Sequence, residues 1–559
     1  MLIRSLNHCV ITVAGLAEGH GLHHRENDAV QDPTTLLSQG INALGGDASI
    51  SSIRTLSYTG STILRGKTLM LGISVKGVDN AAVTSGQQTI TYSFDEQHVK
   101  QRIDKVAALG PGWTFGRANL APMDFSLLVE GGDDGFAAVV RGSYDLYSPG
   151  GQPQGYLDGL LSSYLISEAN KWHPLLLTSI LANGNFTYRS GVTGAGIELP
   201  GVHDNELGLT VLFDPNSNRP YIIRSYENHP FFGASTHDLL VYDYIEVSGV
   251  QFPQRFKTIY NGKHLIGDYR ADEVVANAEL ASDFFTVHGN VTIPVASVPV
   301  RDAEYDFSEI GETSAIFLWP GAYTGTSESI AAAASRPFED LPGLWVISPE
   351  GPLALRQAVV ELEDGSVIVL DAPPHQSKLV MEWAQTTLGK NITHVWPTHH
   401  HHDHAFGAVD YVANGAKLIV PEHAAQYYAT VPKDQIVTYK RGQSMVLEDS
   451  KTLLALVDMD ATIHAEDHGY ALIQPACPTN TSSVAVFDAD HGNLAFLETF
   501  EHAAVHELLD ALARDKVATT AAFLPAHGPA GNITDLTRIA GYLYPSVSPK
   551  EFVHGQPAC

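Results

Sequence analysis

The sequence predicts an α+β protein in two parts, in which a large antiparallel β sheet, curved or half-closed, precedes a layered domain of alternating strands and helices. Three observations support this prediction. The chain has 559 residues, more than a single hydrophobic core usually serves. Up to about residue 290, apolar and polar residues mostly alternate between recurring turns. Beyond about residue 340, short apolar runs are separated by helical patterns, which indicates stacked α and β layers.

The first part is expected to span residues 34–290 as an antiparallel β half-barrel. It opens with a short helix over residues 34–46, "TTLLSQGINALGG", capped by its first threonine and ended by the glycine pair. Its clearest hairpins turn within residues 214–218 and at residues 248–249, where turn-forming residues separate two apolar runs. One helix interrupts the strands near residues 155–172. Consecutive hairpins without interleaved helices favour one large antiparallel sheet.

The second part is expected to span residues 341–559, after a linker at residues 291–340 that is rich in small residues. Strands with a turn at residues 364–365 lead into a helix, "SKLVMEWAQTTLG". The strand "AKLIVPE" and another helical segment follow. This alternation of strands and helices predicts an α/β layered domain.

Charge and hydropathy narrow the classes of partner. The formal net charge is -29, which disfavours nucleic acids and anionic membrane surfaces, since both require a basic protein surface. No apolar run reaches the roughly 18 to 20 residues that a membrane span requires. We therefore expect a small-molecule partner, no nucleic acid and no transmembrane segment, while the sequence leaves the oligomeric state open.

The N-terminal stretch and the cysteines bear on localisation. Residues 1–17 resemble a secretory signal peptide that would be cleaved near Ala17. Five Asn-x-Ser/Thr sequons follow, at Asn185, Asn290, Asn391, Asn480 and Asn532. The chain has three cysteines, Cys9, Cys477 and Cys559. They form no disulfide framework, and a bridge between the last two is left open. We expect a secreted glycoprotein, with a cytoplasmic protein as the alternative.

The stretch "VWPTHHHHDHAFGA", residues 395–408, contains the residues best suited to binding metal ions. A short apolar strand at residues 393–397 ends in proline, so the histidine-rich segment is the loop that leaves it. Alternate residues can face one side, so His399 and His401 can hold one ion, while Asp403 and His404 can reach a second. Clustered histidine and aspartate suit zinc, and paired ions can flank a shared water. The alternative is a solvated histidine run, which the strand before it and the final Asp-His disfavour.

In this setting the C-terminal part resembles the metallo-β-lactamase superfamily over about residues 341–532. "VIVLDAPP" places Asp371 at a strand end, "THHHHDHAFGA" matches the Thr-His-x-His-x-Asp-His motif, and "AAFLPAHGPAG" supplies a late His-Gly. The resemblance implies an αβ/βα sandwich that binds one or two zinc ions, with Asp403 as the catalytic residue. The implied metal ligands are His399, His401, Asp403, His404 and His527.

The sequence departs from the superfamily pattern at the third histidine of the first metal. That position falls on Pro478 or Thr479, neither of which binds zinc. Cys477 is a nearby thiol whose simpler explanation is a buried small residue. His464 and His468, in the preceding loop, could be recruited, although surface imidazoles are the simpler interpretation.

The second departure is at the bridging aspartate, which falls on Glu498 or Thr499. Glutamate could still bridge two ions, so Glu498 is included among the expected ligands. With both positions altered, an incomplete first metal site is a serious alternative.

The N-terminal part resembles the half-barrel of bacterial outer-membrane lipoprotein carriers over about residues 36–290. The resemblance rests on "NALGG", on the hairpin at "FDPNSNRP" and on "YDYIEVSGVQFPQRF". It implies a concave apolar surface suited to a lipid-like or bulky apolar ligand. The alternative is a scaffold that only roofs the active site.

These resemblances imply a metal-dependent hydrolase that cleaves an ester, lactone, thioester or amide bond of an apolar small molecule, as in secondary metabolism. One alternative is an iron-dependent oxygenase on the same fold, which needs an open face of two histidines and one carboxylate. Another is a non-hydrolytic member or a ligand-binding protein, which keeps one metal at Asp403, His404 and His527. The sequence does not identify the substrate.

Overall fold

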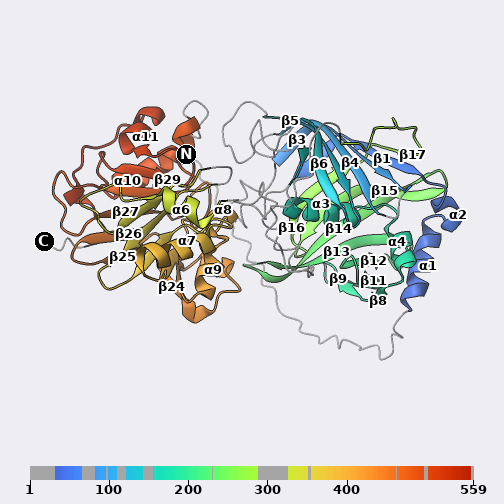
Figure 1. Ribbon diagram of the computed structural model, residues 1–559, viewed down its shortest axis with the longest axis horizontal. Coiled ribbons are helices and arrows are strands. Elements are labelled where there is room, and N and C mark those ends of the chain that lie inside the picture. Colours follow the sequence, from blue (N-terminus) through green and yellow to red (C-terminus); the bar gives the residue numbers. More distant parts are fainter. Residues whose placement is uncertain are drawn as a thin grey trace, which may run out of the picture.

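The computed structural model describes most of the chain in two parts (Figure 1). The described residues are 32–65, 82–95, 98–109, 121–142, 155–157, 159–229, 231–287, 325–350, 354–460, 462–496, 502–555 and 559. The predicted signal peptide at residues 1–17 lies outside them. The fold class is confirmed as α+β, with a mostly antiparallel N-terminal part followed by a sandwich.

One antiparallel sheet of 15 strands forms the N-terminal part, in the order β7-β6-β5-β4-β3-β2-β16-β15-β14-β13-β12-β11-β8, while β1 pairs with β3 and β17. The strands are β1 (Thr55–Gly60), β2 (Thr62–Arg65), β3 (Ala82–Ser93), β4 (Lys100–Leu109), β5 (Ala121–Glu130), β6 (Phe136–Gly142), β7 (Gly155–Tyr156), β8 (Phe186–Tyr188), β11 (Gly201–Asp204), β12 (Leu209–Phe213), β13 (Pro220–His229), β14 (Gly233–Val247), β15 (Val250–Tyr260), β16 (His264–Arg270) and β17 (Glu273–Ala276). A separate pair comprises β9 (Gly191–Val192) and β10 (Glu198–Leu199).

The two predicted hairpins are confirmed as β12–β13 and β14–β15. The second turns at Ser248 and Gly249, with φ of 54° and 78°, which is the left-handed conformation that tight hairpin turns require. The predicted first helix is α1 (Pro33–Ala43). It is capped by Asp32 and not by Thr34, because the Asp32 side chain accepts the N–H of Thr35. The short helix α2 (Asp47–Ile50) follows.

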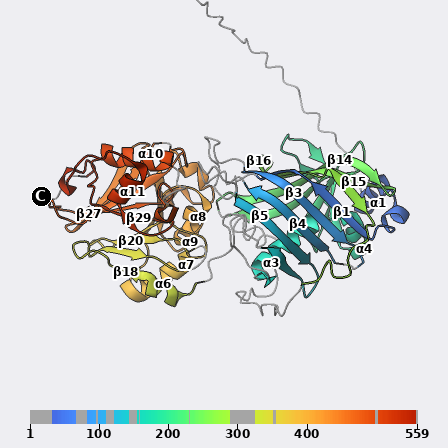
Figure 2. The ribbon, with the colours of Figure 1, turned by 90° about the horizontal axis from the view of Figure 1, so that it is seen from above.

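The concave face of the sheet is filled by the chain's own helices. The predicted helix near residues 155–172 is α3 (Gly159–Lys171), and α4 (Leu176–Asn183) follows it. α3 contacts the neighbouring strands β5 and β6 and also β13, which lies far from them in the sheet order, so it lies across the curve (Figure 2). The cavity beside Trp172 has a volume of about 40 Å³, room for little more than a water molecule. Two larger hollows of the same part, of about 590 and 750 Å³, lie beside α4 and over β13 and β14, so the expected apolar surface stays a prediction.

The described end of the predicted linker belongs to the C-terminal part. It forms α6 (Ser327–Ala333) and β18 (Ala334–Ser335), and β18 pairs with β19 (Leu344–Ile347). A capping box at Thr326 and Ser329 starts this helix, which explains why a small-residue segment is ordered. The remainder, residues 291–324, lies outside the described residues.

Two sheets form the core of the C-terminal part. The first has the order β18-β19-β20-β21-β22-β23-β24 and the second β25-β26-β27-β28-β29-β30. Their further strands are β20 (Gln357–Glu361), β21 (Val367–Leu370), β22 (His394–Trp396), β23 (Lys417–Pro421), β24 (Ile436–Tyr439), β25 (Ser444–Glu448), β26 (Thr452–Asp458), β27 (Gly469–Pro475), β28 (Ala485–Asp488), β29 (Ala522–Pro525) and β30 (Gly531–Asn532). Side chains such as Ile368, Trp396, Leu456 and Phe487 fill the space between them.

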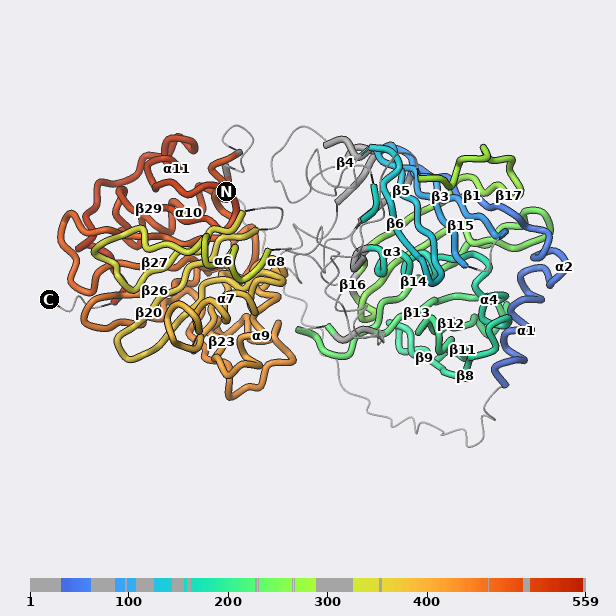
Figure 3. The backbone as a smooth tube through the Cα atoms, in the orientation of Figure 1, coloured from blue at the N-terminus to red at the C-terminus, as the bar shows by residue number. Residues whose placement is uncertain are grey.

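Helices cover the outer face of each sheet and complete an α/β/β/α order of layers (Figure 3). The helices are α7 (Ser377–Trp383), the π-helical turn η1 (Ala384–Leu388), α8 (His402–Ala405), α9 (Ala408–Ala413), α10 (His502–Arg514) and α11 (Ile533–Ala540), with short 3₁₀ turns at Ala425–Tyr427, Lys433–Gln435, Leu494–Phe496 and Pro549–Glu551. α7 and α9 pack on the first sheet, and α10 and α11 on the second. Strands covered on both faces explain the continuous apolar runs in the sequence.

A disulfide joins Cys477 to Cys559 and ties the end of the chain to the segment that follows β27. The bridge that the sequence left open is therefore present, and Cys477 is not available as a thiolate ligand. Among the residues that the structure describes, no helix is long and apolar enough to cross a membrane.

Candidate metal centre

The histidine-rich loop leaves the carboxyl end of β22, as the sequence predicts. β22 pairs in parallel with β21, so the ends of both strands meet at one edge of the sheet. Asp371 follows β21 and has a φ of 65°, a conformation that is uncommon for a residue with a side chain. Its Oδ1 accepts the N–H of Thr398 at 2.7 Å, and its Oδ2 lies 2.8 Å from His404 Nδ1. Asp371 therefore orients both ends of the loop.

The four consecutive histidines alternate between two sides of the loop. His399 and His401 face a shared centre with His464. His400 faces the other way: its Nδ1 lies 2.6 Å from Asp467 Oδ1, and its ring stacks on Tyr427 with 3.8 Å between centroids. This alternation matches the expectation that alternate residues can turn to one side.

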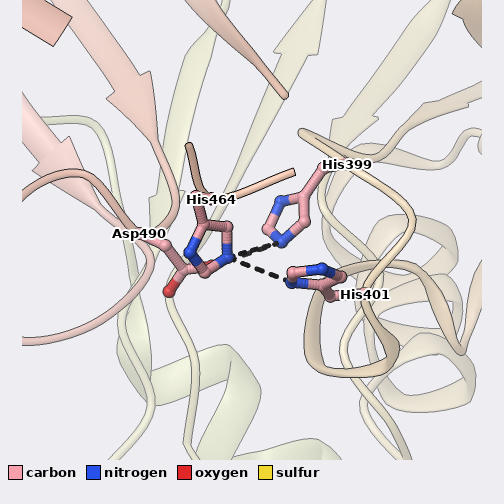
Figure 4. Close-up of side chains that lie close together, drawn as sticks. All are labelled: His399, His401, His464 and Asp490. Atoms are coloured by element: carbon pink, nitrogen blue, oxygen red, sulfur yellow. Dashed lines mark hydrogen bonds and ion pairs between the residues drawn. The ribbon is translucent and has the colours of Figure 1, made fainter. Parts of the chain in front are cut away.

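The first ligand group consists of His399, His401, His464 and Asp490 (Figure 4). His464 Nε2 lies 3.2 Å from His399 Nε2 and 3.0 Å from His401 Nδ1. Asp490 Oδ2 lies 3.1 Å from His464 Nε2 and 3.4 Å from His399 Nε2. The three rings are almost fully buried, so their nitrogens face one another rather than solvent.

The second ligand group consists of Asp403, His404, His527 and, again, Asp490. His404 Nε2 lies 3.0 Å from Asp403 Oδ2 and 2.9 Å from Asp490 Oδ2. His527 Nε2 lies 3.2 Å from Asp403 Oδ2 and 3.1 Å from Asp490 Oδ1. Asp490 is therefore common to both groups: its Oδ2 lies near His399, His464 and His404, and its Oδ1 lies near His527.

The donor atoms fit metal ligation. An ion with bonds of about 2.0–2.1 Å in a tetrahedral site keeps its ligand atoms about 3.3 Å apart. The contacting atom pairs given above lie 2.9 to 3.4 Å apart, and all ligand atoms of a group lie within 4.8 Å of one another. Asp490 Oδ2 is buried beside three imidazoles, yet no donor among the described residues is directed at it in a hydrogen bond. A bound cation would satisfy this buried oxygen together with the imidazoles around it.

The pKa values of the imidazoles differ between the groups. Burial lowers the pKa of His399 and of His401 well below the ordinary value, and neighbouring imidazoles act in the same direction. Burial alone would also lower the pKa of His404, but Asp403, Asp490 and Asp371 raise it well above the ordinary value. In the first group the rings of His399 and His401 are thus neutral, and the carboxylates of the second group attract positive charge, so both suit a cation.

The structure brings together five of the six expected ligands. His399, His401, Asp403, His404 and His527 all lie in the two groups. His464, which the sequence offered as an alternative, lies beside His399 and His401. Asp490 is the carboxylate common to both groups, and Glu498 lies outside the described residues. His464 comes one strand earlier than the expected position, after β26, whereas Asp490 and Glu498 both follow β28.

His468, the other histidine considered for recruitment, belongs to a third buried cluster with Asp488 and His491. Asp488 Oδ1 lies 3.1 Å from His468 Nε2 and 3.0 Å from His491 Nδ1. Burial opposes ionisation of both partners, but Asp488 raises the pKa of His491 to about 10. The His468 ring stacks on His399 at 4.5 Å. This cluster is therefore an internal ion pair that supports the first group and the turn that carries Asp490.

Comparisons with known proteins found a family match in the C-terminal part. Residues 357–513 match the family model described as the metallo-beta-lactamase superfamily. No curated protein matches the chain.

Three solved structures illustrate the likenesses found. A B3 metallo-beta-lactamase with an active-site glutamic acid is 15% identical, with 38% of this chain and 89% of that chain covered and a TM-score of 0.28. A metallo-beta-lactamase from Pontibacter korlensis is 15% identical, with 37% and 96% covered and a TM-score of 0.27. A flavo di-iron protein mutant from Thermotoga maritima is 15% identical, with 37% and 60% covered and a TM-score of 0.29.

We predict that Asp371→Asn weakens metal binding by about 10- to 100-fold, the usual cost of losing a partner that orients a ligand. The amide presents its N–H₂ to the Nδ1–H of His404 and cannot accept that hydrogen, so the ring loses its orientation. Competition titration with a chromophoric chelator measures the affinity. Asp458→Asn is the matched control, because Asp458 is equally buried and accepts the N–H of Gly442. Unchanged affinity in Asp371→Asn would contradict the assigned role.

Proposed function

We propose that the C-terminal domain, a member of the metallo-beta-lactamase superfamily, is a metal-dependent hydrolase that cleaves an ester, lactone, thioester or amide bond. The observation that carries the proposal is the pair of complete ligand groups that share Asp490. Two adjoining metal sites of this kind suit hydrolysis, because they can bind both the attacking and the leaving oxygen. The incomplete-site alternative rested on two missing ligands, and the positions of His464 and Asp490 beside the other candidate ligands favour the complete site instead.

Each group has a distinct part in the proposed chemistry. His399, His401 and His464 would hold one ion, and Asp403, His404 and His527 the other, with Asp490 between them. Bound ions of this type polarise a carbonyl and lower the pKa of bound water from 15.7 to about 7. The residues themselves fix the positions of these charges before substrate arrives, which is the main source of electrostatic catalysis.

Asp403 is the proposed proton acceptor. Its Oδ2 lies near His404 and His527, whereas its buried Oδ1 has no hydrogen-bond partner among the described residues. Burial would raise the pKa of Asp403, but His404 and His527 lower it below the ordinary value, so the side chain is a carboxylate. The lowered pKa makes Asp403 a weak base, so a proton that its unpartnered Oδ1 accepts in turnover is held only briefly and passed on.

The N-terminal part has two hollows, of about 590 Å³ beside α4 and about 750 Å³ over β13 and β14, that could receive part of a substrate. The preference for an apolar substrate stays a prediction. We therefore keep the proposal at the level of the bond cleaved.

Secretion is our proposal for localisation. The Cys477–Cys559 disulfide is typical of an oxidising compartment. Of the five sequons, those at Asn185, Asn391 and Asn480 are exposed. The side chain of Asn532 instead caps α11 by accepting the N–H of Asp535, so that sequon is a poor acceptor for a glycan.

We predict that the purified protein contains about one to two zinc ions per chain and hydrolyses at least one member of a panel of esters, lactones, thioesters and amides. Chelation should abolish hydrolysis, and added zinc should restore it. Asp403→Asn should lower kcat/KM by about 100-fold or more, whereas Asp458→Asn should leave it unchanged. Fully loaded protein that cleaves nothing, or that contains iron and consumes oxygen, would contradict the hydrolase.

A second prediction concerns localisation. Protein collected from the medium of a secreting host should show, by intact mass, one disulfide and glycans at one or more of Asn185, Asn391 and Asn480. Glycosidase treatment should remove the added mass. Free thiols at both cysteines and no glycan would favour the cytoplasmic alternative.

A further inference from the structure

One turn of the N-terminal sheet inserts into the C-terminal part beside the metal loop. β13 ends at His229 and β14 begins at Gly233. Between them Phe231 is buried in the C-terminal core, where its ring lies 5.2 Å from Tyr428 and 6.1 Å from Phe406. The N–H of Thr430 donates to the carbonyl oxygen of Phe231 at 3.2 Å. The turn is therefore held by both side-chain packing and a main-chain hydrogen bond.

At this contact a histidine of the N-terminal part lies against a histidine of the C-terminal part. His229 Nε2 lies 2.8 Å from His402 Nε2, and both side chains are buried, although 173 residues separate them in the sequence. The Nδ1 of His229 accepts the N–H groups of Phe231 and Phe232 at 3.0 and 3.2 Å. Since Nδ1 is an acceptor, the hydrogen of this ring is on Nε2, and His229 donates it to His402.

The acceptor, His402, lies between two of the proposed metal ligands in the sequence. His402 begins α8 and separates His401 from Asp403. It points away from the ligand groups and stacks against Phe231, with 5.5 Å between ring centroids. His400, the other outward histidine of the loop, is fixed by Asp467 within the same domain. The loop is thus anchored on its outer side at alternate residues, once from its own domain and once from the N-terminal sheet.

We propose that His229 is a positioning residue for the metal centre: by donating to His402 it fixes the start of α8 and, with it, the directions of His401 and Asp403. A main chain held at His402 cannot rotate without carrying its two neighbours, one of which belongs to each ligand group. The N-terminal sheet would then set the metal affinity of the C-terminal domain through one hydrogen bond. This inference rests on the proposed metal sites and not on the bond that they cleave.

If the turn between β13 and β14 served only as a packing contact, different results would be expected. If the turn only filled space, any side chain of similar volume would serve, and its loss would lower stability without changing how the metal is bound. A positioning role requires the donor at Nε2, because a buried acceptor left without its donor is costly and drives His402 to another orientation. Metal affinity and the geometry around the metal therefore distinguish the two roles.

The test compares His229→Asn with His229→Gln in the full-length protein. The asparagine oxygen can replace Nδ1 as acceptor for the turn but ends short of His402. The longer glutamine places its amide N–H₂ near the position of Nε2 and can restore the donor. We expect His229→Asn to weaken zinc binding by about tenfold or more, at the lower end of what loss of an outer partner costs, and His229→Gln to recover most of it.

The readouts are zinc affinity by chelator competition and the visible absorption of the cobalt-substituted protein, which reports ligand geometry without any substrate. Phe231→Leu is the control, because it disturbs the same packing and leaves the His229–His402 pair in place. We expect it to lower the melting temperature and leave the affinity and the cobalt spectrum unchanged. If His229→Asn does not fold, His402→Phe keeps a ring against Phe231, removes the acceptor and should give the same loss of affinity.

The outcomes separate this inference from the proposed hydrolase. Wild-type zinc affinity and cobalt spectrum in His229→Asn, or equal losses in His229→Asn and Phe231→Leu, would overturn the positioning role alone. Weaker binding in His229→Asn, rescued by glutamine, in a protein that hydrolyses no substrate would support the positioning role and contradict the hydrolase. A wild-type protein that binds no metal would overturn both.

Discussion

The carboxylate of Asp490 stands between imidazoles of two ligand groups, and the rest of the domain holds that arrangement in place. Removing carboxylates and imidazoles from water is costly unless charge or hydrogen bonds compensate. Around Asp490 the compensation is incomplete without a cation, since its Oδ2 lies beside three rings and no described donor is directed at it. The local fold therefore makes physical sense as a site that binds metal.

Support for this arrangement comes from outside the ligand groups. Asp371, after β21, accepts from both ends of the loop, and Asp488, at the end of β28, pairs with His491 beside Asp490. The outward histidines of the loop are held as well, His400 by its own domain and His402 by the N-terminal sheet. The loop from His399 to His404 and the turn that carries Asp490 thus each have a buried anchor one or two residues from a ligand. Such anchoring fixes ligand directions in advance and reduces the reorganisation that metal binding requires.

The sequence predicted the features that are local. The motif from Thr398 to His404 is contiguous, so its spacing alone indicates which side chains share a side, and hairpin turns such as Ser248–Gly249 are set by neighbouring residues. The sequence offered His464 only as an alternative and missed Asp490, because the place of each depends on which apolar run is which strand. β26 is buried at every residue and β27 at all but its last, so neither shows the alternation that would identify its place in the sheet. The helix near residues 155–172 was predicted, but its packing on the concave face of the N-terminal sheet was not, since tertiary contacts decide it.

Anomalous diffraction from crystals of the zinc-loaded protein, recorded on both sides of the zinc absorption edge, tests the shared-carboxylate account most directly. The account predicts two peaks, one among His399, His401 and His464 and one among Asp403, His404 and His527, with Asp490 within bonding distance of both. A single peak that leaves either group without metal at saturating zinc, or two peaks that Asp490 does not touch, would contradict it.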